Sequence, residues 1–188
     1  MKRVDISDSE LVRTCLEGDE GSYLTLMDRY RASAMAAALN ILVNREDAED
    51  VCQEAFFKAL QNLDRFDQQK SFRNWFYALL CNLCLDQIRK KRSFYHFLRK
   101  FRSEQPQPGL PRPNDPGPDP LLKRNLLRHL SPKERTAMYL WAQEGYTGAE
   151  IASVLECSPK TAHVYLYKAR RKLKDWLKEN KNVRLQKI

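Results

Sequence analysis

The last third of the chain contains two successive runs of apolar residues at helical spacing. In the first run, Ile151, Ala152 and Leu155 fall one helical turn apart, and in the second run apolar residues recur every three or four positions. This pattern predicts two amphipathic helices. The second run consists of Ala162, Leu166, Ala169, Leu173 and Leu177.

A short polar break, residues 156–158, separates the two runs. Ser158 is suited to cap a helix, and Pro159 suits the first helical position, where its missing N–H costs nothing. The second helix is therefore predicted to begin near residue 159. Two short helices joined in this way form a helix-turn-helix over residues 144–173, a motif that binds duplex DNA.

The second predicted helix carries polar and basic side chains opposite its apolar stripe. Lys160, Lys168 and Arg171 can reach phosphates or guanine edges. Tyr167 can stack or donate a hydrogen bond, and Val164 can meet a thymine methyl. This outward face therefore suits a major groove, although a solvated basic helix in a bundle is an alternative interpretation.

An acidic helix with two different faces is predicted over residues 45–60. One face is an unbroken apolar stripe that is expected to pack inward. The opposite face is acidic and polar but lacks a nucleophile, a histidine or a glycine-rich loop nearby, so it does not indicate catalysis. An aromatic ring beside acids indicates a docking surface for a positively charged protein, with an ordinary acidic helix surface as the alternative. The inward stripe is Ala48, Val51, Cys52, Ala55, Phe56, Ala59, Leu60 and Leu63; the outward face is Asp47, Asp50, Gln53, Glu54 and Phe57.

A polar loop and an aromatic-rich helix follow over residues 63–92, and Ser71 can cap this helix. Its apolar stripe is expected to lie mostly in the core. Aromatic rings interleaved with polar side chains are also what a protein needs to hold an unstacked base, and the sequence leaves both interpretations open. The stripe is Phe72, Trp75, Phe76, Leu79, Leu80 and Leu83; the polar residues are Arg65, Lys70, Arg73, Asn74 and Asn82.

The composition agrees with a nucleic-acid partner. The 188 residues include 33 Lys and Arg against 24 Asp and Glu, which leaves a formal net charge of +9 and a pI near 9.4. Positive charge is concentrated in residues 89–102, which contain no acid, and again on the second helix of the motif. A solvated basic surface is the alternative for residues 89–102.

Most of the nine prolines lie between residues 103 and 120, where Leu110 is almost the only apolar residue. Such a stretch cannot form a packed element and is predicted to be an extended linker. The chain is long enough for one moderate core or two small ones, and the linker favours two. The expected fold is therefore all-α, with two small helical domains, 1–102 and 121–188, joined by the Pro-rich linker 103–120.

The first residues lack the apolar segment of a signal peptide, and no apolar run is long enough to span a bilayer. We therefore expect a cytoplasmic protein whose five cysteines are reduced, buried thiols. Cys81 and Cys84 form a C-x-x-C with His96 downstream, but without a second pair core packing is preferred to a zinc or redox site. No catalytic residue and no metal site are expected.

Taken together, these motifs resemble those of the extracytoplasmic-function sigma factors, the two-domain members of the sigma-70 family that direct bacterial RNA polymerase to promoters. Residues 47–60 are similar to region 2.2 of that family. Residues 72–92, with Trp75, Asn82, Asp86 and Arg89, resemble regions 2.3 and 2.4, and residues 130–173 resemble region 4. The resemblance spans nearly the whole chain in the family's order, including the linker.

The resemblance implies a role for each surface. The acidic face would dock on the clamp coiled coil of the largest polymerase subunit. The C-terminal domain of this chain would contact the flap of the second-largest polymerase subunit. The loop and the aromatic helix would bind the minus-10 element and capture a flipped base, and the helix-turn-helix would bind the minus-35 element. The implied core-binding residues are Asp47, Asp50, Gln53, Glu54 and Phe57; the minus-10 residues are Arg65, Phe66, Lys70, Arg73, Asn74, Asn82, Arg89 and Arg92; the minus-35 residues are Lys160, Thr161, His163, Val164, Tyr167, Lys168 and Arg171.

The resemblance further implies that polymerase supplies the catalytic metal, so this chain would hold no cofactor and take no small-molecule substrate. It implies control by an anti-sigma protein, which can hold the factor at the inner membrane. At two places the sequence departs from the usual pattern of the family, which limits the DNA contacts that the resemblance can predict. Val164 and Tyr165 stand where the family often has a small polar residue and Arg, and Ala78 stands where many relatives place a base. The minus-35 sequence therefore cannot be copied from a relative.

Two other classes of protein are considered. A helix-turn-helix repressor or activator would bind duplex DNA unaided, but it leaves the acidic face and the basic aromatic helix unexplained. A small DNA-processing enzyme would need H-E-x-x-H, a P-loop or a metal-binding carboxylate cluster, and no such motif is found in the sequence. Charge reversal at Glu54 separates a sigma factor from a repressor, because only a sigma factor needs the acidic face.

Overall fold

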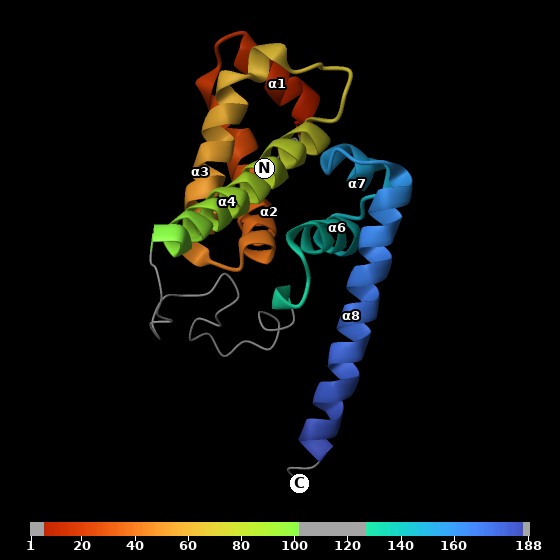
Figure 1. Ribbon diagram of the computed structural model, residues 1–188. Helices are drawn as coiled ribbons and strands as arrows, with labels where there is room; N and C mark the ends of the chain where they lie inside the picture. The colour runs from red at the N-terminus through yellow and green to blue at the C-terminus, as the bar shows by residue number, and fades with distance from the viewer. Residues whose placement is uncertain (1–5, 102–126, 186–188) are drawn as a thin grey trace.

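The protein is described by a computed structural model that places residues 6–101 and 127–185 (Figure 1). The N-terminal unit consists of α1 (Asp8–Leu16), α2 (Glu20–Leu42), α3 (Arg45–Gln61), the 3-10 turn η1 (Leu63–Arg65) and α4 (Phe72–Phe101). The C-terminal unit consists of α6 (Pro132–Ala142), α7 (Gly148–Val154) and α8 (Pro159–Leu185). The described residues contain no strand, so the all-α prediction is confirmed. The predicted linker, 103–120, lies outside the described residues.

The helices that carry the candidate sites begin at the predicted caps. The Oγ of Ser71 accepts a hydrogen bond from the backbone N–H of Asn74 at 3.3 Å, at the start of α4. The Oγ of Ser158 accepts one from the N–H of Thr161 at 3.1 Å, and Pro159 is the first residue of α8. Both cap predictions are confirmed, and they set which side chains of α4 and α8 face outward.

Helices α2, α3 and α4 pack against one another around an aromatic core. The rings of Phe56 and Phe76 stack with centroids 4.9 Å apart, and Tyr30 lies 5.6 Å from both Phe72 and Phe76. The predicted apolar stripe of α4 is confirmed as core, because Phe72, Phe76 and Leu80 are buried. Such ring pairs add to the free energy gained by burial alone.

The helix-turn-helix prediction is also confirmed. Helix α8 packs on both α6 and α7, and the predicted stripe is buried at Ala162, Leu166 and Ala169. Leu177 is exposed, because α8 continues past the other helices of its unit (Figure 1).

The two units are in contact, with α6 against α2 and α7 against α4 (Figure 1). The buried residues of both units form one continuous cluster. The prediction of two small helical domains is confirmed, but their buried residues join into one cluster and do not form two separate cores. A proline-rich stretch indicates where a chain lacks packed elements, but it does not indicate whether the flanking units touch.

Candidate protein and nucleic-acid interfaces

The outer face of α3 presents the predicted docking residues Asp50, Gln53, Glu54 and Phe57, all of them exposed. The Phe57 ring is 60% exposed, which is unusual for so large an apolar side chain. Glu54 forms an ion pair with Lys58 at 2.7 Å, one turn further along the helix. The face thus combines an apolar projection with carboxylates, as a docking surface requires.

Asp47 does not share this face. Its carboxylate accepts two hydrogen bonds from Lys91 Nζ, each 2.7 Å long, and one from Gln87 Nε2 at 3.4 Å. Only 14% of the side chain is exposed. Asp47 therefore ties α3 to α4, and the prediction that places it among the docking residues is not supported by its position.

A groove of about 620 Å³ lies beside the docking face, between α2 and α3. Helix α2 contributes Met27, Arg31 and Met35 to this groove, a contribution not predicted from the sequence although the three recur at the four-residue spacing of one helix face. Leu60 was predicted to point inward, but it is 46% exposed and lines this groove. The apolar lining comes from Tyr23, Met27, Met35, Cys52, Phe56, Phe57 and Leu60.

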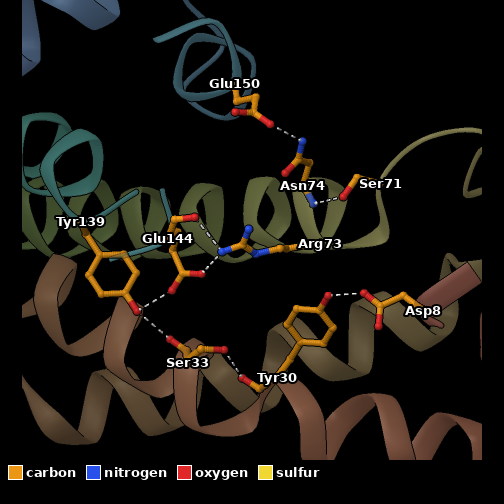
Figure 2. Close-up of polar contacts among 9 residues, drawn as sticks. All are labelled: Asp8, Tyr30, Ser33, Ser71, Arg73, Asn74, Tyr139, Glu144 and Glu150. Atoms are coloured by element: carbon orange, nitrogen blue, oxygen red, sulfur yellow. Dashed lines mark hydrogen bonds and ion pairs between the residues drawn. The ribbon is translucent and has the colours of Figure 1, made fainter. Parts of the chain in front are cut away.

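Arg73, a predicted minus-10 residue, points into the contact between the two units (Figure 2). Its Nη2 donates to the Glu144 carboxylate at 2.6 Å and to the Glu144 carbonyl oxygen at 2.8 Å. The guanidinium also lies over the Tyr146 ring, 5.1 Å from its centroid. Burial lowers the pKa of Arg73, but the hydrogen bond and charge of Glu144 outweigh this effect and raise the pKa above its usual value. Arg73 therefore remains charged.

Two further minus-10 residues are engaged in the same way. Asn74 Nδ2 donates to Glu150 at 3.4 Å, and Asn82 Nδ2 donates to Glu156 at 3.0 Å. Hydrogen bonds from Thr147 at the start of α7 hold the pKa of Glu150 below its usual value. Three predicted promoter-binding residues thus meet three glutamates of the C-terminal unit.

The remaining minus-10 residues differ in position. Arg65 and Lys70 are exposed on the loop before α4, and Arg89 and Arg92 are exposed near the end of α4. Phe66 is only 7% exposed, with its ring 5.1 Å from that of Trp75. The prediction that Phe66 contacts DNA is therefore not supported, because the ring is used to fix the loop to the core. The loop and the helix end remain accessible: Arg65, Lys70, Arg89 and Arg92.

The outward face of α8 is the most accessible of the predicted surfaces. Tyr167 is 65% exposed and Val164 is 41% exposed. His163 lies against the start of α7, where a Cβ on Gly148 would come within 2.8 Å of its Nε2. Thr161 is half-buried and bonds to the Ser158 cap. Apart from Thr161 the predicted minus-35 residues are exposed: Lys160, His163, Val164, Tyr167, Lys168 and Arg171.

The cysteines give no sign of a site. Cys52, Cys81 and Cys84 are buried, whereas Cys15 and Cys157 are only partly buried. Burial raises the pKa of Cys52 to about 11 and that of Cys81 to about 12, so neither thiol is reactive at neutral pH. Within the described ranges no three His, Cys, Asp or Glu side chains gather into a possible metal site. No helix in those ranges has the length and apolar character to cross a bilayer.

The geometry defines a helical protein with a helix-turn-helix, a second basic helix and, on α3, a separate exposed face of acidic side chains around Phe57. Comparison with known families agrees: the model of sigma-70 region 2 matches residues 26–94, and that of sigma-70, region 4 matches residues 124–173. The chain belongs to the sigma-70 family, in its extracytoplasmic-function group. Its members are transcription initiation factors.

Known relatives share much of the chain. The RNA polymerase sigma factor NccH of Alcaligenes xylosoxydans xylosoxydans is 28% identical over 174 residues, 88% of this chain and 92% of the relative. The ECF sigma factor SigW of Bacillus subtilis is 34% identical over 85 residues, 45% of this chain and 46% of the relative.

Solved structures share the fold. CnrH, in complex with the cytosolic domain of CnrY, has a TM-score of 0.68 at 24% identity over 92% of this chain and 97% of CnrH. RpoE of Bartonella quintana, in complex with the anti-sigma factor NepR, has a TM-score of 0.65 at 21% identity over 83% of this chain and 96% of RpoE.

Proposed function

We propose that this protein is a promoter-specificity factor that binds core RNA polymerase through the outer face of α3. It binds the minus-35 element as duplex DNA, with the outward face of α8 in the major groove. It captures the minus-10 strand with α4 and the preceding loop. The supporting observation is that one chain presents a docking face with exposed Phe57 and a separate recognition helix with exposed Tyr167. A repressor needs only the second of these.

The protein contributes binding and no catalysis of its own in this account. Strand opening is favoured because the open strand, once its flipped base is bound, has more contacts than the duplex. Polymerase carries out the chemistry with its own metal. The protein would therefore act in the cytoplasm, where its polymerase is.

Control by an anti-sigma protein is part of the proposal. CnrH and the Bartonella quintana RpoE, which share the fold, were both solved in complex, the one with the cytosolic domain of CnrY and the other with an anti-sigma factor. The groove between α2 and α3, lined by Met27, Met35 and Leu60, suits the apolar side of an amphipathic helix. An inhibitor bound there would lie beside Phe57 and compete with polymerase.

Charge reversal on α3 tests the docking face. Glu54→Lys is expected to weaken binding to purified core polymerase by tenfold or more, about the effect of a desolvated charge pair changed to a repulsive one. The control is Glu17→Lys, which makes the same charge change at an exposed position of the N-terminal unit. Binding is measured by titration of labelled protein with core polymerase. Equal affinity of the two variants would contradict the assignment of α3.

A further inference from the structure

The C-terminal end of α4 carries exposed aromatic rings that none of the interfaces described above uses. Phe94 is 59% exposed and Phe97 is 55% exposed, although both belong to a regular helix whose end lies at the edge of the N-terminal unit (Figure 1). The two residues are three positions apart, so they share one face of the helix. Single exposed apolar residues are common, but two large neighbouring rings on one face indicate a binding surface.

The same end of α4 is strongly basic, because residues 89–102 contain no Asp or Glu. Two of its cations are paired within the fold: Arg89 with Asp86, and Lys91 with Asp47. Lys90 and Arg92 are exposed, and no acid in the described part of the chain pairs with either of them. The basic residues of this stretch are Arg89, Lys90, Lys91, Arg92, Arg99, Lys100 and Arg102.

Positive charge also gathers beside this end of α4 from the C-terminal unit. Burial, followed by the charges of Arg92 and Arg128, lowers the pKa of Arg135 on α6 to about 10. The Nε of Arg135 is buried and has no hydrogen-bond partner in the described chain. Three arginines therefore repel one another here, and a bound anion would relieve that repulsion.

The rings and the charges lie on different sides of the helix. Arg89, Arg92 and His96 are exposed and recur at three- and four-residue spacing. On a helix this spacing places them roughly opposite Phe94 and Phe97. A protein that stacks single-stranded bases needs rings and cations along one surface. Separated faces are instead typical of a helix that lies in a bilayer interface, with rings among the acyl chains and cations near the headgroups.

We propose that the end of α4, residues 89–98, binds the surface of an anionic phospholipid bilayer, with Phe94 and Phe97 inserted and the basic side chains near the lipid phosphates. Lys90, one turn before Phe94, is long enough to reach the headgroups from the side of the rings. A lipid phosphate bound to Arg92 would compete with the promoter contact proposed for this residue. Only that competition rests on the function proposed above.

The test is cosedimentation of the full-length protein with vesicles. One set contains equal parts of phosphatidylcholine and phosphatidylglycerol, and the other contains phosphatidylcholine alone. Wild-type protein is expected to bind the first set much more strongly. Phe94→Ser with Phe97→Ser should lower its partition coefficient by about tenfold or more, because two rings no longer enter the bilayer. The control is Leu24→Ser with Leu177→Ser, which removes two apolar side chains that are 59% and 47% exposed and should leave binding unchanged.

A second pair of variants separates a specific basic surface from the net charge of the whole protein. Lys90→Gln with Arg92→Gln is expected to weaken binding to the anionic vesicles by about tenfold. Lys174→Gln with Lys178→Gln removes the same charge from exposed positions of α8 and should have a clearly smaller effect. Thermal unfolding checks that each variant is folded. If the double phenylalanine variant is not, Phe97→Ser alone replaces it, with a smaller loss in the same direction.

No binding of wild-type protein to the anionic vesicles, or equal binding by the ring variant and its control, would overturn the inference. Loss of affinity for a single-stranded oligonucleotide in the ring variant, in a protein that does not bind vesicles, would assign the rings to nucleic acid instead. Vesicle binding is measured without polymerase or promoter DNA. A negative result therefore leaves the proposed function standing, and run-off transcription tests that function separately.

Discussion

At the scale of single residues, Glu134 shows how one side chain joins two helices. Its carboxylate accepts hydrogen bonds from Lys172 Nζ on α8 at 2.7 Å and from the backbone N–H of Ser131 at 2.8 Å. Burial raises the pKa of Glu134, but these bonds outweigh it and hold the pKa below the usual 4.5. The ionised form therefore stabilises the fold at pH values above the unfolded pKa, and this contribution is lost as the pH falls through the folded pKa.

Glu134→Gln is expected to lower the free energy of unfolding by about 1–2 kcal/mol at neutral pH, because a bond to a charged group is replaced by a weaker neutral one. The difference from wild type should shrink as the pH falls below the usual Glu pKa of 4.5. Urea denaturation across this range measures it, with exposed Glu179→Gln as the control. A difference that is independent of pH would mean that the ionised carboxylate is not the source.

At the scale of helices, periodicity and caps predicted much of what the structure contains. Ser71 and Ser158 identified the starts of α4 and α8, because a hydroxyl that can accept the first free N–H is a local signal. The apolar stripe that contains Phe76 identified the inward face of α4, and the stripe that contains Leu166 identified the inward face of α8. These predictions succeeded because each depends on residues within a few positions of one another.

Predictions failed where a neighbouring helix decides the outcome. Asp47 pairs with Lys91, which lies 44 positions away, and its own helix gives no sign of this partner. Leu60 continues an apolar stripe, yet its side chain is exposed. Phe66 lies in a polar loop, but its ring packs against Trp75 and is buried in the core. Periodicity names a face of a helix, and tertiary packing determines whether that face is covered.

The outward face of α8 carries a prediction at this same scale. Val164→Ala is expected to change which base is preferred at one position of the minus-35 element, with a loss of about 1–3 kcal/mol at the preferred sequence. Lys168→Ala should instead weaken binding to all sequences about equally and reduce the salt dependence. Selection of random duplexes by each variant, followed by titration at several salt concentrations, measures both. Identical selected sequences for wild type and Val164→Ala would exclude a base contact there.

At the scale of the whole molecule, the contact between the units could not be predicted from the sequence. It depends on Arg73 and Glu144, which are 71 positions apart and on opposite sides of the linker. Neither residue belongs to a motif that indicates pairing, and a proline-rich linker is equally compatible with separated units. The family resemblance identified the surfaces, whereas the structure shows which of them are open together.

Run-off transcription tests whether this protein directs polymerase to promoters. Purified core polymerase is supplied with genomic promoter fragments, with and without the protein. We expect discrete transcripts that require the protein and disappear with Glu54→Lys but persist with Glu17→Lys. Binding of the protein to duplex DNA on its own, with no new transcript at any protein concentration, would contradict the claim and favour a repressor or activator.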